Sequence, residues 1–293
     1  MFYLLLVSII WGFSFGLIKT NLTSIDPILV TGLRLMVACF VFLPFLKLRK
    51  VDKKTLLPLL AIGSIQFGLM YIFYNWSFQY LKAFEVALFT IFTPFYVVLI
   101  NNIIERKWNL YNLVTSILAI IGTGIIVHTG FNRPGMIAGF MIVQLSNICF
   151  AIGQVLYRRI MLVNGSIKDI EIFAIPYFGG FLTAAVVSVA LVDWNKIIIT
   201  STQWWNLLYL GALASGLGFF LWNYGARRTN IGALAIFNNL KIPLAITVSL
   251  IFFHEQADLP SLFLGGLIVL GSLLLNEGFE KRQHKAVIIT PIK

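Results

Sequence analysis

A helix that crosses a lipid bilayer is predicted by the stretch Ile231-Gly-Ala-Leu-Ala-Ile-Phe-Asn-Asn-Leu-Lys-Ile-Pro-Leu-Ala-Ile-Thr-Val-Ser-Leu-Ile-Phe-Phe253, because it is long and almost entirely apolar. Lys241 lies near its middle, where an ammonium group costs roughly 2.5–3.5 kcal/mol to insert. Asn238 lies one turn earlier on the same face, and Pro243 removes a backbone donor two residues later. A cation at this depth indicates a water-filled cavity, a partner carboxylate or an anionic ligand beside the helix.

The composition of the whole chain is that of an integral membrane protein. Of its 293 residues, 59% are hydrophobic and 11% are charged, whereas a soluble domain carries about 25% charged residues. Further runs of roughly 20 apolar residues match the hydrocarbon core of a bilayer. They predict an all-α membrane protein with ten transmembrane helices at residues 3–18, 28–47, 56–79, 83–103, 110–129, 136–157, 171–192, 204–225, 231–253 and 259–278.

The positions of the positive charges predict how these helices are oriented. With a cytoplasmic N-terminus, 16 of the 22 Lys and Arg residues fall in cytoplasmic loops or in the C-terminal tail. The others, in outer loops or within spans, are Lys19, Lys82, Arg133, Lys196, Arg34 and Lys241. This bias predicts that both termini are cytoplasmic. The net charge of +11 is therefore attributed to membrane orientation rather than to a nucleic-acid partner, and the expected location is the cytoplasmic (inner) membrane.

The two halves of the chain resemble each other in opposite orientation. Phe89–Ile100 and Phe237–Val248 are similar apolar segments, each with a proline near its middle, Pro94 and Pro243. Because each half holds five predicted spans, the second half enters the membrane from the other side. Such inverted repeats are typical of secondary transporters, which bind substrate near the midplane. The two prolines are candidates for gating, or they only tune helix packing. The predicted units are residues 1–130 and 136–278, followed by a basic cytoplasmic tail at 279–293.

Several short motifs resemble a known transporter family. Trp11-Gly12 in the first span and Arg34 in the second are similar to the EamA-type drug/metabolite transporter superfamily. A closer similarity, to the biotin importers of its carboxylate/amino acid/amine branch, lies in Gln144–Gly153, Ala214–Gly225 and Asn238–Pro243. The resemblance implies a secondary transporter that imports biotin by alternating access. The alternative is an exporter of amino acids or other small metabolites from the same superfamily.

Lys241 is the strongest candidate for substrate binding. Three roles remain open for it: binding a substrate carboxylate, pairing with a structural carboxylate such as Glu85, or carrying a coupling proton. Asn238 on the same face is expected to bind beside it. Arg34 is expected to form a structural or gating ion pair. Glu85, at the outer mouth of its helix, is expected to act in gating or coupling, or to extend to the interface.

Amide and aromatic side chains supply the other candidates. Amides on the face of one span would bind a neutral polar group such as a ureido ring, or would link helices. Aromatic rings would hold the apolar body of the substrate, or would simply pack in the core. The further substrate-binding candidates are Asn147 and Gln144 in the sixth span, Trp222, Asn223 and Tyr224 in the eighth, Gln66 and Tyr71 in the third, and Trp11 and Ser14 in the first.

No motif in the sequence indicates catalysis, a metal or a cofactor. His128, His254 and His284 lie at span ends or in the tail, so none would activate a nucleophile within the membrane. The sequence has no phosphate-binding loop and no metal-ligand spacing of His, Cys, Asp or Glu. We therefore expect no enzyme and no cofactor. The expected partners are a small-molecule substrate, biotin or another small carboxylate, and the lipid bilayer, for a monomer or a dimer.

Overall fold

The computed structural model describes residues 2–106, 134–165, 167–228 and 231–255, together with the single residues 260, 267 and 271. For residues 231–240 it describes the backbone only. The predicted spans at 110–129 and 259–278 and the predicted tail at 279–293 lie outside the described residues, apart from those single positions.

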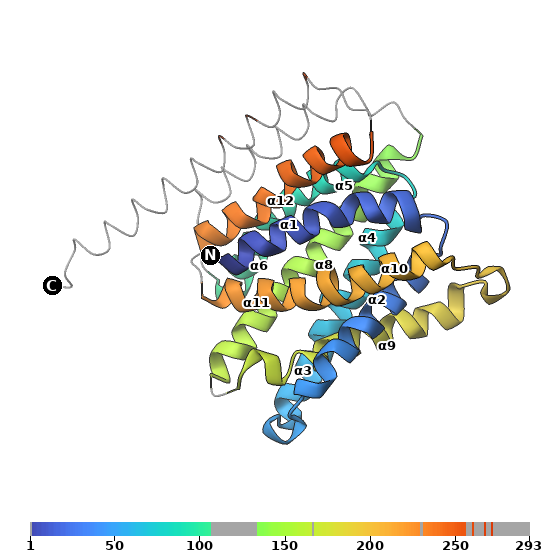
Figure 1. Cartoon of the computed structure of the whole chain (residues 1–293). Helices are drawn as coiled ribbons and strands as arrows, with labels where there is room; N and C mark the ends of the chain where they lie inside the picture. Colours follow the sequence, from blue (N-terminus) through green and yellow to red (C-terminus); the bar gives the residue numbers. More distant parts are fainter. Residues whose placement is uncertain are drawn as a thin grey trace.

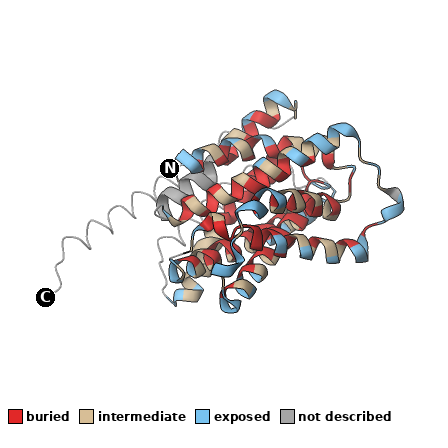
Figure 2. Ribbon diagram, turned by 60° about the horizontal axis from the view of Figure 1, so that its bottom comes forward, coloured by how far each residue is buried: buried red, intermediate tan, exposed pale blue. Residues whose placement is uncertain are grey.

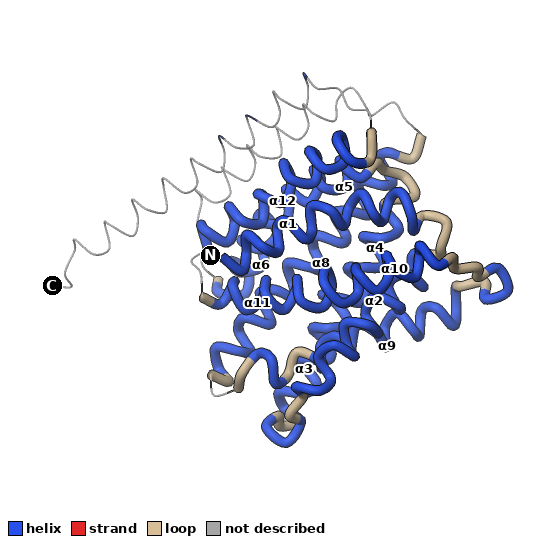
Figure 3. Tube along the Cα trace, in the orientation of Figure 1, coloured by secondary structure: helices blue, strands red, loops and turns tan. Residues whose placement is uncertain are grey.

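Every regular element in the described part of the chain is a helix, and short loops join the helices (Figures 1 and 3). The longer helices are α1 (Phe2–Leu17), α2 (Pro27–Phe42), α3 (Lys53–Gly63), α4 (Met70–Ser77), α5 (Ala83–Phe89), α6 (Thr93–Glu105), α8 (Met136–Val163), α9 (Ala174–Leu191), α10 (Ser201–Tyr209), α11 (Gly218–Arg227) and α12 (Ile231–Phe252). Short π or 3₁₀ segments are η1 (Ile18–Leu22), η2 (Leu43–Phe45), η3 (Leu48–Lys50), η4 (Ser64–Leu69), η5 (Thr90–Phe92), η6 (Asp169–Glu171), η7 (Trp194–Lys196) and η8 (Leu210–Leu217).

Continuous helical segments of this kind are suited to a membrane. Within the described residues, seven are long and apolar enough to cross one: Phe2–Leu22, Pro27–Phe45, Lys53–Ser77, Ala83–Glu105, Met136–Val163, Ala174–Leu191 and Ser201–Arg227. Each coincides with a predicted span, and α12 covers an eighth. The boundaries differ most at α8, which was predicted to end at residue 157 and continues to Val163. Arg158 and Arg159 suit the edge of a membrane, but arginine is a good helix former and does not end a helix.

The helices pack as a bundle whose buried residues face inwards and whose exposed residues lie outside (Figure 2). α1 packs against α12, α2 against α9, and α6 against α8. Large apolar side chains face outwards, and Val186 and Val189 of α9 are 70% and 80% exposed. In water such a surface would mark an interaction site or a liability. Around a bundle whose solvent is lipid, it is the expected surface.

Two helices of the bundle approach each other backbone to backbone. A Cβ atom on Gly63 of α3 would overlap the carbonyl oxygen of Pro176 on α9, and one on Gly179 would overlap that of Leu60. Small residues that allow such close approach are typical of helix packing within membranes.

Three of the spans in the described part of the chain contain a π-helical segment: η1 follows α1, η4 lies between α3 and α4, and η8 lies between α10 and α11. A π segment leaves some carbonyl groups without their usual helical donor. In η8 the Trp11 indole N–H donates to the carbonyl of Ala214 at 2.9 Å, and the Tyr177 hydroxyl lies 2.7 Å from the carbonyls of Ser215 and Gly216. Side chains from α1 and α9 therefore stabilise the irregular backbone of the span that runs through η8.

The predicted proline interruptions differ between the two halves. In the fourth span the helix changes at η5, and Pro94 lies in the first turn of α6, where its missing N–H has no cost. The hydroxyls of Thr90 and Thr93 donate to the carbonyls of Ala87 and Thr90 at 2.7 and 2.6 Å. α12, by contrast, continues through Pro243, and the side chain of this proline is exposed.

Candidate functional site

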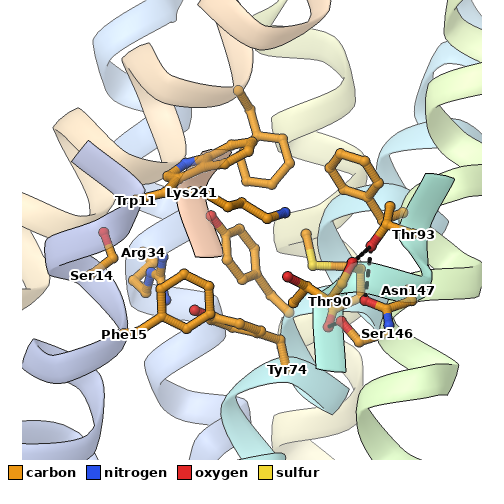
Figure 4. Close-up of a pocket in the computed structure, with 14 residues that line it drawn as sticks. Trp11, Ser14, Phe15, Arg34, Tyr74, Thr90, Thr93, Ser146, Asn147 and Lys241 are labelled. Atoms are coloured by element: carbon orange, nitrogen blue, oxygen red, sulfur yellow. Dashed lines mark hydrogen bonds between the residues drawn. The ribbon is translucent and has the colours of Figure 1, made fainter. Parts of the chain in front are cut away.

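A cavity lies inside the bundle, where α1, α2, α4, η5, α6, α8, α11 and α12 meet (Figure 4). The empty space at this site is about 530 Å³, which includes space open to the surroundings. Its lining residues are Trp11, Ser14, Phe15, Arg34, Met70, Tyr71, Tyr74, Thr90, Thr93, Ser146, Asn147, Phe150, Phe219 and Lys241. These residues form three kinds of wall: cationic, aromatic, and neutral polar.

Two cations face this cavity, Lys241 from α12 and Arg34 from α2 (Figure 4). Both are deeply buried, with 6% and 1% of their surface exposed. The Lys241 ammonium lies 5.3 Å from the centre of the Trp11 ring and 5.9 Å from that of Phe150. The described residues that line the cavity include no Asp or Glu. The cavity is therefore electropositive and chemically suited to an anion.

The guanidinium of Arg34 is held by neutral groups. Its Nε donates to the hydroxyl of Ser215 and its Nη1 to the amide oxygen of Asn75, each at 3.2 Å. Asn75 Nδ2 donates in turn to Thr31 at 2.9 Å, which fixes the orientation of the amide. The charge also lies 4.3 Å from the centre of the Tyr71 ring. These contacts orient Arg34 without neutralising it.

The neutral polar wall consists of Thr90, Thr93, Ser146 and Asn147 (Figure 4). The hydroxyls of Thr90 and Thr93 donate to backbone carbonyls, and that of Ser146 donates to the carbonyl of Met70 at 3.0 Å. Asn147 Nδ2 donates to the carbonyl of Phe89 and to Gln144 Oε1, at 2.9 and 3.1 Å. Because these donors are engaged with the protein, the oxygen lone pairs are what this wall offers a ligand. It is suited to accept hydrogen bonds.

Aromatic rings form most of the rest of the lining, together with Ser14 and Met70. Trp11 lies 4.9 Å from Phe219, and Tyr71 lies 5.5 Å from the same ring, centroid to centroid. Phe15 and Tyr74 meet edge to face at 5.7 Å. Such mutual packing holds the rings in place, so they present a preformed apolar surface to a ligand.

The structure brings about half of the predicted site residues to this cavity. Of the predicted substrate-binding residues, those that line it are Lys241, Asn147, Tyr71, Trp11 and Ser14. Arg34, predicted to act in gating, lines it as well. Asn238 lies on α12, but its side chain is outside the described residues.

Three predicted residues of α11 lie away from the cavity lining. Trp222 packs behind Trp11, with ring centres 5.2 Å apart. Asn223 donates to the backbone carbonyl of Phe219 at 3.1 Å. Tyr224 packs under the guanidinium of Arg228 at 3.5 Å, at the end of the helix.

Two predicted glutamines are buried but are not among the residues that line the cavity. Gln144 orients Asn147 through the hydrogen bond already described, so any effect on a ligand passes through that residue. Gln66 is fully buried beside Gly153, and within the described part of the chain neither polar atom of its amide has a hydrogen-bond partner.

Glu85 lies at the start of α5, where its carboxylate accepts a hydrogen bond from the backbone N–H of Lys82 at 2.8 Å. A second carboxylate, Glu255 from the segment after α12, accepts from the N–H groups of Ala83 and Phe84 at 2.8 and 3.1 Å. Glu255 was not predicted as a site residue, because a single acidic residue beyond a span has the pattern of an ordinary loop. Together the two glutamates cap α5 and join it to the end of α12.

A different set of polar contacts lies at the end of α11 and around η6. Arg227 pairs with Asp169 at 2.7 Å, and the Tyr157 hydroxyl donates to the same carboxylate at 2.8 Å. Nearby, Lys47 and Lys50 pair with Glu171 at 2.8 and 2.9 Å. These hydrogen bonds from two ammonium groups lower the pKa of Glu171 to about 2.

The lining residues that sequence reasoning missed are Phe15, Met70, Tyr74, Thr90, Thr93, Ser146, Phe150 and Phe219. Most lie one residue or one helical turn from a predicted residue, as Phe15 does from Trp11 and Tyr74 from Tyr71. Extending each candidate along its helix face would have found them. Metal-binding side chains were not predicted, and among the described residues no three His, Cys, Asp or Glu side chains come close enough to hold an ion.

A family model matches almost the entire chain. It describes the EamA-like transporter family and matches residues 1–128 and 137–277. One solved crystal structure has the same fold, with a TM-score of 0.70 over 93% of this chain and 95% of its own, at 14% sequence identity.

Curated relatives share more of the sequence. A biotin transporter of Salmonella typhimurium is 38% identical over 92% of this chain and 90% of its own length. A probable biotin transporter of Pseudomonas aeruginosa is 35% identical over 94% of this chain and 96% of its own. A probable amino-acid metabolite efflux pump of Escherichia coli is 25% identical over 97% of this chain and 96% of its own.

Proposed function

The chain belongs to the EamA-like transporter family, and we propose that it imports biotin across the cytoplasmic membrane by alternating access. It is a multi-pass membrane transporter rather than an enzyme, since it is similar to transporters over nearly their full length. The biotin transporters among those relatives support the choice of substrate.

The proposed architecture is ten helices in two inverted five-helix units, at residues 1–130 and 136–278, with both termini in the cytoplasm. Helix contacts support the inversion. α1 packs on α12 as α8 packs on α6, and α2 packs on η8 as α9 packs on η4. In both comparisons the two helix pairs occupy equivalent positions in the repeat. The cavity would then lie between the units, where secondary transporters bind substrate.

The observation that carries the substrate assignment is a cavity whose described lining has two cations, aromatic walls and no carboxylate. Biotin has a carboxylate at one end, an apolar chain and bicycle, and a ureido ring. In the proposed complex the carboxylate binds Lys241, and the apolar part packs on Trp11, Tyr71 and Phe219. An ammonium–carboxylate hydrogen bond in such surroundings is roughly twice as strong as one between neutral groups.

The neutral polar wall fits the other end of biotin. The ureido ring carries two N–H donors. Thr90, Thr93 and Asn147 present oxygen atoms to it, because the donor groups of these three side chains are already bonded to backbone carbonyls. A wall that accepts hydrogen bonds selects a ligand with N–H groups over one without them. Recognition would therefore use both ends of the substrate, charge at one and hydrogen-bond donors at the other.

Export of amino acids is the second candidate, and the efflux pump among the relatives supports it. An amino acid in its zwitterionic form needs an acceptor for its ammonium group. Among the described residues, the cavity lining holds two cations and no carboxylate, so a zwitterion would meet repulsion at its positive end. We therefore favour uptake of an anionic substrate.

Uptake of labelled biotin at nanomolar concentration, in cells without their own biotin importer, tests this function. Lys241→Met removes the proposed anchor, so uptake is expected to fall by at least about tenfold. Lys54→Met is the matched control, because Lys54 is exposed in the first turn of α3, and it should transport normally. A well-expressed native chain that takes up no biotin, or a Lys241→Met variant with undiminished uptake, would refute the substrate or the anchor respectively.

A further inference from the structure

We propose that Arg34 is a second anion-binding residue of the cavity, so that the substrate carboxylate binds between Arg34 and Lys241. The inference deepens the proposed function and rests on it for the identity of the substrate. The same two cations would bind any small carboxylate in the same way. It differs from the expectation drawn from the sequence, which gave Arg34 a structural or gating role.

The first observation is that Arg34 is buried although no opposite charge among the described residues neutralises it. Arg34 is 1% exposed, yet its partners among the described residues are all neutral: Ser215, Asn75 and the ring of Tyr71. Arginine stays protonated in proteins, so it does not escape burial by losing its charge. A buried charge without an opposite partner is costly. A carboxylate in the cavity would remove this cost.

The second observation concerns the donors that remain. A guanidinium has five N–H groups, and the hydrogen bonds to Ser215 and Asn75 use one on Nε and one on Nη1. The other three belong to Nη1 and Nη2 of a side chain that lines the cavity. Two N–H groups on neighbouring nitrogens match the two oxygens of a carboxylate. Ser215 and Asn75 thus orient a guanidinium that still has donors to offer.

The third observation is the position of the two cations. Arg34 comes from α2 and Lys241 from α12, and they enter the same cavity from different sides (Figure 4). In the proposed repeat, α2 and α12 belong to different five-helix units. A carboxylate that contacts both cations therefore links the two units. Its binding would favour the conformation in which the two cations are close together.

A purely structural Arg34 would behave differently. A structural residue supports the fold through its hydrogen bonds to Ser215 and Asn75, and it has no reason to distinguish a charged ligand from a neutral one. The distinguishing readout is therefore the preference for biotin over biotin amide, in which a carboxamide replaces the carboxylate. Transport activity alone would not separate the two roles.

The experiment measures binding of biotin and of biotin amide to the purified full chain. For Arg34→Gln we expect the preference for the acid over the amide to fall by about 10- to 100-fold, with little change in amide affinity. Ser215→Ala is the control, because it removes a partner of Arg34 but keeps the charge, and it should retain most of the preference. Equal losses for acid and amide, or an unchanged preference, would overturn the inference.

A second variant and a second pair of ligands complete the experiment. If Arg34→Gln does not fold, Arg34→Lys keeps a charge without the paired donors, and the acid preference should drop to an intermediate value. An Arg34→Lys variant with the full preference would count against the paired contact. If the native chain binds no biotin, the proposed substrate fails, and hexanoate with hexanamide replace the biotin pair. No preference for hexanoate in the native chain would then overturn the inference as well.

Discussion

The Lys241 ammonium has aromatic rings close to it, at 5.3 Å in Trp11 and 5.9 Å in Phe150. A desolvated cation–π contact contributes up to about 2 kcal/mol, but contacts near the 6 Å limit contribute less. Insertion of a lysine at the membrane centre costs roughly 2.5–3.5 kcal/mol. The rings therefore offset part of the cost of Lys241, and an anion in the cavity would lower the energy of the ammonium further.

Thr93 allows a prediction at the level of one hydroxyl. Its Oγ1 lies 2.6 Å from the carbonyl of Thr90 and 3.2 Å from Asn147 Oδ1. Thr93→Val keeps the shape and removes the oxygen, so biotin affinity should fall by about tenfold, the value of one hydrogen bond. Thr183→Val is the control, because Thr183 bonds only within α9. Equilibrium binding measures both, and equal affinities for the two variants would contradict the role of Thr93.

The site residues that could be predicted best from the sequence were polar residues deep within an apolar span. Lys241 was identified because a charge in the middle of an apolar span needs an explanation, and it lines the cavity. Trp222 and Gln66 were proposed on residue type, but aromatic and amide side chains also pack between helices, and both are buried outside the lining. Which face of a helix meets the cavity depends on how the helices rotate against each other, and sequence spacing does not fix that rotation.

At the scale of elements, α5 and α12 are joined by a carboxylate. Glu255 accepts hydrogen bonds from Ala83 and Phe84 at the start of α5. Glu255→Ala would leave these two N–H groups without that acceptor, so we expect a loss of about 0.5–2 kcal/mol. The unfolding temperature of the purified protein should fall accordingly. Glu105→Ala, at the exposed end of α6, is the control and should leave this temperature unchanged.

The two spans that contain Pro94 and Pro243 are similar in sequence but differ in structure. Pro94 and Pro243 occupy similar places in the two segments, yet the helix changes at η5 in one span and continues through Pro243 in the other. The threonines at 90 and 93 explain the difference, because their hydroxyls bond the carbonyls around η5. α3–α4 and α10–α11 instead share a feature that the sequence did not reveal, a π segment in each.

At the scale of the whole molecule, the family and the all-helical membrane fold were predicted correctly from composition, span length and motifs. The contacts at the two ends of the bundle were not predicted. Asp169, Glu171 and Glu255 lie in loops or short turns, and their partners are far away in the sequence. Pairings of this kind depend on the packed structure, so no local pattern indicates them.

Glu171 leads to a prediction about pH. Lys47 and Lys50 lower its pKa from 4.5 to about 2 in the folded protein. A carboxyl group with a lowered folded pKa stabilises the protein above its unfolded pKa, and this contribution is lost as the pH falls towards the folded value. The native chain should therefore lose stability between about pH 4.5 and pH 2, and Glu171→Gln should lose less. Thermal unfolding across this range measures it, and parallel curves would contradict the assignment.

The polar contacts at the two ends of the bundle also bear on transport. Arg227 is the last residue of α11, shortly before α12 begins, and Glu255 follows the end of α12, which is 22 residues long, or about 33 Å. The cavity lies between them, with Lys241 near the middle of the helix. In the proposed topology, the contacts of Asp169 and Arg227 close the cytoplasmic end, and those of Glu255 close the outer end. Alternating access then requires each set to open while the other is closed.

Asp169 tests this cycle most directly, because it accepts from both Arg227 and Tyr157. Asp169→Asn removes the charge of the pair, so we expect the maximal rate of biotin uptake to change severalfold while the KM changes little. Exchanging the charges, with Asp169→Arg and Arg227→Asp together, should recover part of the native rate. Tyr157→Phe removes only a hydroxyl and should have a smaller effect than Asp169→Asn. A proportional change in KM, or a charge exchange that recovers nothing, would mean that the pair supports the fold rather than the closing of one end.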